Sequence, residues 1–126
     1  MPRIRMLLVA LAALAVLLVG ATTATAKGPE VRVQGTCTGA SSAKLKLKLD
    51  NGRIEVEGEV DQNRVGVVWS WSIQRAGAAI ASGSATTTAP SGSFSVRRLV
   101  TNRPGPDTIT LSASRAGETC TATATL

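Results

Sequence analysis

The chain has 126 residues, enough for one small domain, and carries a formal net charge of +6 without any histidine. The lack of histidine excludes serine and cysteine triads with a His base, and it excludes every His-containing metal site. No glycine-rich loop is followed by Lys-Ser or Lys-Thr, so the sequence contains no phosphate-binding loop. We therefore predict a protein that is not an enzyme and that holds no cofactor or metal.

Residues 1–26 have the composition of an export leader. A basic start (MPRIR) is followed by the apolar run MLLVALAALAVLLV and by a tail of small residues that ends at Ala26. The run of roughly 14 residues is shorter than the ~20 that span a bilayer, which indicates a cleavable signal peptide rather than a membrane anchor. We predict cleavage after Ala26, a secreted extracellular domain over residues 27–126, and no stable membrane insertion after cleavage.

Cys37 and Cys120 are the only cysteines in the sequence. An even number of cysteines in an exported chain predicts one disulfide, because the compartment outside the cell is oxidising. The closed loop would contain nearly the whole domain, for which the chain-entropy model gives roughly 4.5 kcal/mol of stabilisation. The alternative is a pair of free thiols.

Strand-length segments alternate with Gly, Pro, Asn and Asp after residue 27, and no segment has a sustained helical period, which predicts an all-β fold. The clearest unit is AKLKLKLDNGRIEVEGEV at residues 43–60, where Asn51-Gly52 favours a two-residue type I′ hairpin turn. This turn places the apolar residues of both strands on one face and sets each lysine against a glutamate on the other. The expected charged pairs are Lys48 with Glu55, Lys46 with Glu57 and Lys44 with Glu59.

A second hairpin is predicted at Ala76-Gly77, which joins strands over about 65–75 and 78–87. Its register sets Ile73 opposite Ile80, and sets Trp71 and Trp69 opposite Ser82 and Ser84. Large side chains would then face small ones.

A third hairpin is predicted at Ala116-Gly117, where strands over 107–115 and 118–126 meet and Arg115 pairs with Glu118. The outward face of this hairpin is a row of Ser and Thr. The inward residues are Ile109, Leu111, Ala113, Cys120, Ala122 and Ala124.

Two further strands complete the predicted set. The first lies near 30–34, and the other begins at Phe94 and Val96 within SGSFSVRRLV. Arg98 would point inward in the second of these strands, so we expect a bulge or a strand end there. Seven or eight strands at these turn spacings predict an antiparallel β-sandwich.

The strings GRIEVEGEVDQNRVG and TTAPSGSFSVRR, with one cysteine before the first and another near the end of the chain, resemble a group of small secreted actinobacterial single-domain proteins. The resemblance covers about residues 35–120 and implies an immunoglobulin-like β-sandwich that is exported, without an assigned activity. A fainter likeness is to secreted actinobacterial chromophore carriers, which are also small immunoglobulin-like domains. Those carriers have four cysteines, whereas this chain has two.

Two groups of residues with carboxylate or amide side chains could in principle form a catalytic or metal site. Glu55, Glu57 and Glu59 share one strand face at spacings of about 7 Å, within the separation of an inverting glycosidase pair. Their position on an open face opposite lysines favours a structural charge ladder instead. A second group, which is formed by Asp50, Asn51 and Asp61, matches no calcium-loop spacing.

Trp69 and Trp71 lie two apart in a predicted strand and share a face, as a platform for sugar rings would. The alternative is a place in the core, which needs large side chains because the chain has one Phe and no Tyr.

The arginines are the other candidates for ligand binding, above all Arg97 and Arg98. Together with Arg64 and Arg103 they would attract anionic polymers if they cluster, and otherwise they form a solvated surface. Without the leader the balance is 12 basic to 8 acidic residues, and because much of this charge is paired along the chain we predict no nucleic-acid partner.

We therefore predict a monomeric, secreted, non-enzymatic module that binds an unknown extracellular or cell-wall ligand at the cell envelope, or serves a structural role there. One alternative is a secreted enzyme inhibitor that uses the loop over 102–107. Another alternative is a carbohydrate-binding module that uses Trp69 and Trp71.

Overall fold

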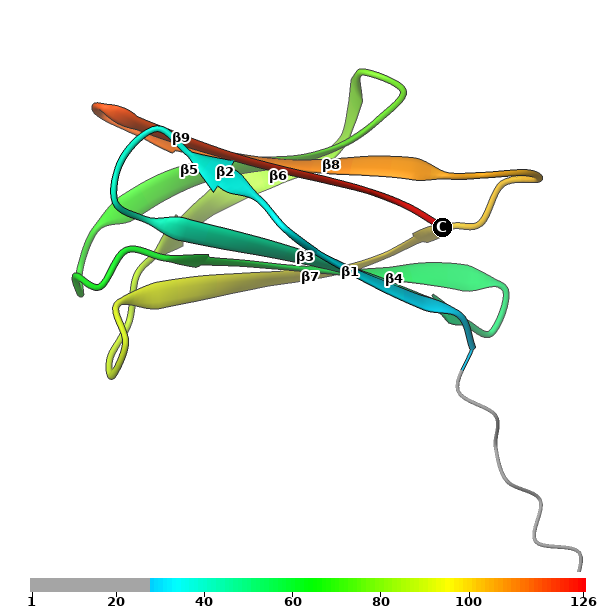
Figure 1. Cartoon of the computed structure of the whole chain (residues 1–126), viewed down its shortest axis with the longest axis horizontal. Helices are drawn as coiled ribbons and strands as arrows, with labels where there is room; N and C mark the ends of the chain where they lie inside the picture. Colours follow the sequence, from blue (N-terminus) through cyan, green and yellow to red (C-terminus); the bar gives the residue numbers. More distant parts are fainter. Residues whose placement is uncertain (1–27) are drawn as a thin grey trace, which may run out of the picture.

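The computed structural model describes residues 28–126, so the predicted leader and its cleavage after Ala26 lie outside the described residues. These residues form nine strands in two antiparallel sheets that stack face to face (Figure 1). No helix in this part of the chain is long and apolar enough to cross a membrane. The strands are β1 (Glu30–Gln34), β2 (Thr36–Cys37), β3 (Ser42–Asp50), β4 (Arg53–Asp61), β5 (Val68–Arg75), β6 (Ala78–Thr86), β7 (Ser93–Thr101), β8 (Thr108–Arg115) and β9 (Glu118–Thr125).

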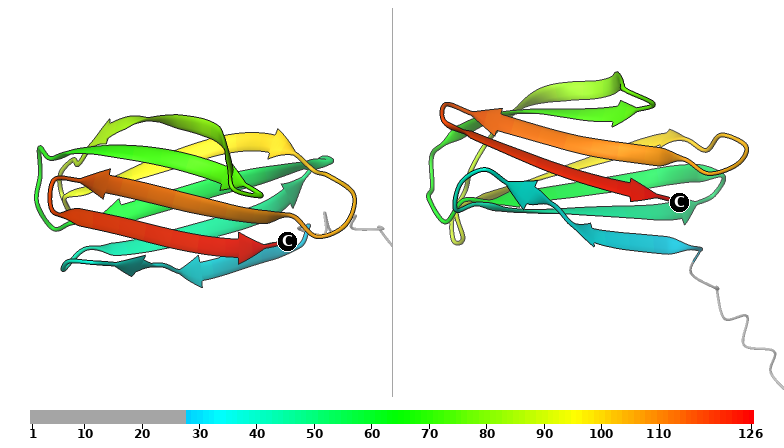
Figure 2. Two further views of the ribbon diagram at one scale, coloured as in Figure 1. Left: turned by 90° about the horizontal axis from the view of Figure 1, so that it is seen from above. Right: turned by 45° about the horizontal axis from the view of Figure 1, so that its top comes forward.

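One sheet has the order β1-β3-β4-β7 and the other the order β2-β9-β8-β5-β6 (Figure 2). The chain passes from one sheet to the other at Gly35, because β1 pairs with β3 while β2 pairs with β9. A Cβ at Gly35 would lie 2.6 Å from the carbonyl oxygen of Thr121, so only glycine fits there. The first predicted strand is confirmed as β1, and the crossing adds the short strand β2, so that there are nine strands where seven or eight were expected.

The β3–β4 hairpin has the predicted turn and register. Asn51 and Gly52 have φ values of 55° and 79°, as a type I′ turn requires, and every pair from Ser42↔Asp61 to Asp50↔Arg53 is in place. Nζ of Lys46 lies 2.9 Å from Glu57 and Nζ of Lys44 lies 3.7 Å from Glu59. The third ion pair differs from the prediction, since Glu55 pairs at 3.1 Å with Arg97 of β7 instead of with the facing lysine.

The β8–β9 hairpin and the disulfide are also confirmed. Arg115 pairs with Glu118 at 3.2 Å, and the predicted inward residues of both strands are buried. Cys37 is bonded to Cys120, its direct partner across β2 and β9.

The register predicted for β5 and β6 is wrong beyond the first two pairs. A bulge between Ile73 and Gln74 shifts the pairing by one residue, so that Ile73 faces Ala81. Trp71 and Trp69 consequently face Gly83 and Ala85 rather than serines. The shift has a steric reason, because a Cβ at Gly83 would meet the Trp71 ring at 3.0 Å.

The expected bulge or strand end at Arg98 is absent from β7. This strand continues to Thr101 in regular register with β4, with Arg98 opposite Val56. Because β7 is an outer strand, the inward-pointing Arg98 side chain reaches solvent, and its guanidinium lies 4.9 Å from the centre of the Trp71 ring.

Replacement of Asn51-Gly52 by two valines tests the hairpin that fixes the first sheet. Both positions have positive φ, which costs a β-branched residue about 1 to 2 kcal/mol each, so thermal denaturation should show a clearly lower Tm. The variant T121V/T123V places two valines at exposed strand positions and serves as the control. An unchanged Tm for the turn variant would contradict this register.

Candidate binding surfaces

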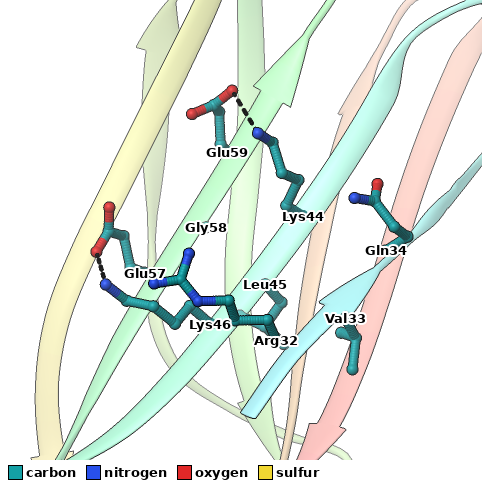
Figure 3. Close-up of a pocket in the computed structure, with 9 residues that line it drawn as sticks. All are labelled: Arg32, Val33, Gln34, Lys44, Leu45, Lys46, Glu57, Gly58 and Glu59. Carbon is teal, nitrogen blue, oxygen red and sulfur yellow. Dashed lines mark ion pairs between the residues drawn. The ribbon is translucent and has the colours of Figure 1, made fainter. Parts of the chain in front are cut away.

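The outer face of the β1-β3-β4-β7 sheet carries charged side chains in rows that run across the strands. Arg32, Lys46 and Glu57 form one row, and Gln34, Lys44 and Glu59 form the next. A shallow groove of ≈300 Å³ lies between the two rows (Figure 3). Its charged groups already have partners, since Lys46 contacts both Glu57 and Glu30.

Two carboxylates of this face have lowered pKa values, which keep them ionised. A hydrogen bond from Arg97 lowers the pKa of Glu55, and one from Arg32 lowers the pKa of Glu30. A glycosidase acid needs a raised pKa instead. The face therefore matches the structural charge ladder that the sequence indicates.

The outer face of the other sheet carries hydroxyl groups, also in rows across the strands. We use the name hydroxyl face for two of these rows, which are defined by the strand pairing. The first row is Thr36, Thr121, Ser112, Ser72 and Ser82, and the second is Thr119, Ser114, Ser70 and Ser84. Neighbours within a row lie about 4.8 Å apart by strand spacing, and the rows are about 7 Å apart.

A hollow of ≈340 Å³ lies at the centre of the hydroxyl face. It exists because the central strands carry serines, which are shorter than most side chains. Its lining residues are Ser70, Trp71, Ser72, Ser112, Ala113, Ser114 and Thr119, none of which titrates near neutral pH. Without a neighbouring base these hydroxyls are not activated as nucleophiles, so the hollow is suited to hydrogen bonding.

The charged residues in the strands of this sheet occupy inward-facing positions at strand ends. Arg75 and Glu118 are buried, and Arg115 is partly buried beneath the turn of its hairpin. Glu118 accepts hydrogen bonds from the Ser41 hydroxyl at 2.7 Å and the Ser41 amide at 3.0 Å, and these bonds lower the pKa of its carboxyl group. The hydroxyl face is therefore polar and uncharged.

A buried ion pair fixes the loop between β7 and β8. Nε of Arg75 lies 3.3 Å from Oδ1 of Asp107 without hydrogen-bond alignment, while Arg75 Nη2 donates to the Thr101 carbonyl. Asp107 also accepts a hydrogen bond of 3.0 Å from the Arg103 amide. Both ends of the exposed segment 102–106 are thus held, one by the contact at Thr101 and the other by Asp107.

The structure places Trp69 and Trp71 in the core, with exposed fractions of 0% and 6%, which confirms that interpretation. Their faces offer no open platform for sugar rings. The Trp69 indole also donates a hydrogen bond of 3.0 Å to Gln62.

The candidate arginines do not form one cluster. Arg98 lies against Trp71, whereas Arg97 lies on the charged outer face. Arg64 and Arg103 follow opposite ends of the β4–β7 ladder, near Asp61 and Thr101 respectively. Asp50 and Asp61 are likewise at opposite ends of β3 and β4, so no calcium site forms there.

From the sequence alone, only the hydroxyl-face residues of the β8–β9 hairpin could be predicted. The alternation in TITLSAS and ETCTATAT predicts outward Ser and Thr on β8 and β9. The rows extend to β5 and β6 through the β5–β8 pairing and the β6 bulge, neither of which has a local sequence signal.

No protein-family model matches this chain, and searches of the curated proteins and of the solved structures found no match.

The variant D107A tests the clamp on the 102–106 segment. It leaves the Arg75 guanidinium buried without its counter-ion, which should cost about 3 to 5 kcal/mol and lower the Tm by more than about 10 °C. The Arg103 amide should lose its protection from hydrogen exchange. The variant E59A removes an exposed carboxylate as a control. Unchanged stability and protection would contradict the clamp.

Proposed function

We propose that the protein is a secreted, non-enzymatic binding module of the cell envelope, and that its hydroxyl face binds a neutral polysaccharide. The observation that carries this proposal is an uncharged lattice of Ser and Thr hydroxyls around a hollow without titratable groups. The opposite face of the same domain is densely charged. Because one outer face is uncharged and the other is charged, the two faces are suited to different roles.

Polysaccharide chemistry matches this lattice. Each Ser or Thr hydroxyl both donates and accepts hydrogen bonds, as each sugar hydroxyl does. Burial of hydroxyls costs far less free energy than burial of charges, and charged residues are depleted at the centres of interfaces. A repeating polymer contacts several sites at once, which raises its overall affinity.

The proposed compartment rests on the leader sequence and on the disulfide, which is consistent with an oxidising environment outside the cell. The immunoglobulin-like assignment is part of the proposal too. The order β9-β8-β5-β6 corresponds to the G-F-C-C′ sheet of variable immunoglobulin domains. The β3–β4 hairpin departs from that topology, and so does a disulfide between neighbouring strands of one sheet.

Co-sedimentation with insoluble cellulose, chitin and β-1,3-glucan tests the proposal, with polygalacturonate as an anionic comparison. We expect binding to at least one neutral polymer that persists at high salt. The variant S112K places a cation at the edge of the hollow and should weaken this binding more than about tenfold. The variant S95K makes the same change on the opposite face and should bind normally. Retained binding by S112K, or binding to the anionic polymer alone, would contradict the proposal.

The clamped loop favours a second candidate function, inhibition of an extracellular protease that takes an arginine into an acidic pocket. Arg103 lies in the exposed segment and its amide is fixed by Asp107, so little conformational entropy is lost on binding.

Trypsin, whose specificity pocket contains an aspartate, is the probe for this second candidate. Inhibition at micromolar protein, abolished by R103A and retained by R53A, is the expected result. A lack of inhibition at this concentration would remove the inhibitor hypothesis.

A further inference from the structure

β6 is the outermost strand of its sheet, where it pairs only with β5 (Figure 2). Among residues 28–126, no strand pairs with its other edge. An open strand edge presents unpaired N–H and C=O groups, and it is a template for pairing with another chain.

The other outer strands are each protected against such pairing. β1 has five residues and carries Glu30 and Arg32, and β2 has two residues. β7 carries two adjacent arginines. In contrast, β6 has nine residues, AAIASGSAT, without any charge or proline. Its bulge lies near the beginning of the strand and leaves Ala81–Thr86 in regular register.

The regular part of β6 contains the palindrome Ala81-Ser82-Gly83-Ser84-Ala85. If this segment pairs antiparallel with its own copy around Gly83, Ser82 lies opposite Ser84 of the second copy, and Ala81 lies opposite Ala85. Serine then meets serine and alanine meets alanine in these pairs, so small, uncharged side chains face one another on both sides of the two-fold axis of an isologous interface. No charged residue of the strand approaches another across such an edge.

We propose that β6 pairs with β6 of a second copy of this chain across a two-fold axis at Gly83. Both five-stranded sheets then form one continuous sheet. Ser82 and Ser84 end the two rows of the hydroxyl face, so each row continues into the other row of the second copy. This dimer does not depend on the polysaccharide proposal, although it would double the hydroxyl face.

The expected association is weak and strengthens with salt. A single strand edge with small side chains buries little area, at the low end of specific interfaces, below about 1,200 Å². Each domain without its leader carries a net charge of +4, from 12 basic and 8 acidic residues, and salt screens the repulsion between the two copies.

Sedimentation equilibrium of the protein without its leader, from micromolar to millimolar concentration, tests this dimer. We expect the mean mass to rise toward twice the monomer value with concentration. The variant S82K/S84K sets lysines directly opposite lysines of the second copy and should remain monomeric. The variant S112K/S114K adds the same charge to the same face on β8, inside the sheet, and should still dimerise.

Monomers at every concentration, or equal effects of the two lysine pairs, would overturn the proposal. Cysteine substitution then tests the register. A mixture of S82C and S84C should form cross-linked dimers, whereas S82C alone should not, because Ser82 faces Ser84 of the second copy. The reverse pattern would exclude the axis at Gly83. Loss of polysaccharide binding by S112K with an intact dimer would separate this inference from the proposed function.

Discussion

Two indoles have to fit between the sheets of a domain that has one phenylalanine and no tyrosine. Trp69 and Trp71 are the largest side chains of the core, and β6 passes over them with small residues. Gly83 lies against the Trp71 ring, where any side chain would force a shift. On the open side of the sandwich, Arg98 covers the same ring with its guanidinium. Packing of the tryptophans thus determines which residues β6 can carry.

The same packing organises the outer surface. The bulge in β6 places Ala and Gly over the tryptophans and turns Ser82 and Ser84 outward. These serines then continue the rows that begin on β9 and β8. Because the charged side chains of these strands point inward at strand ends, the outer surface stays neutral. Desolvation of a polar but uncharged face costs less free energy than desolvation of a charged one, which is why we propose this face as the binding surface.

Local patterns in the sequence were sufficient for the hairpins whose turns and alternation agree. Asn51-Gly52 and the Lys–Glu alternation fixed one register, and the Ser/Thr alternation around Ala116-Gly117 fixed another. The β5–β6 register was mispredicted because the bulge depends on contact between β6 and Trp71, which no local pattern encodes. The ion pair between Arg97 and Glu55 was missed for a similar reason, since it joins strands 42 residues apart.

The exposed edge of β6 was equally invisible in the sequence. An outer strand is recognised only when the sheet order is known, and only then does the palindrome around Gly83 acquire a meaning. The charged outer face was predicted in part, because the ladder of Lys–Glu pairs lies within the single β3–β4 hairpin. The hydroxyl lattice needs the pairing of β5 with β8, whose partners lie far apart in sequence.

Amide chemical shifts of isotope-labelled protein during titration with soluble neutral oligosaccharides test the central assignment most directly. The account predicts shifts confined to the residues around the hollow, above all Ser70, Ser72, Ser112 and Ser114. Shifts confined to the charged groove around Lys44 and Lys46, or to the 102–106 segment, would contradict it.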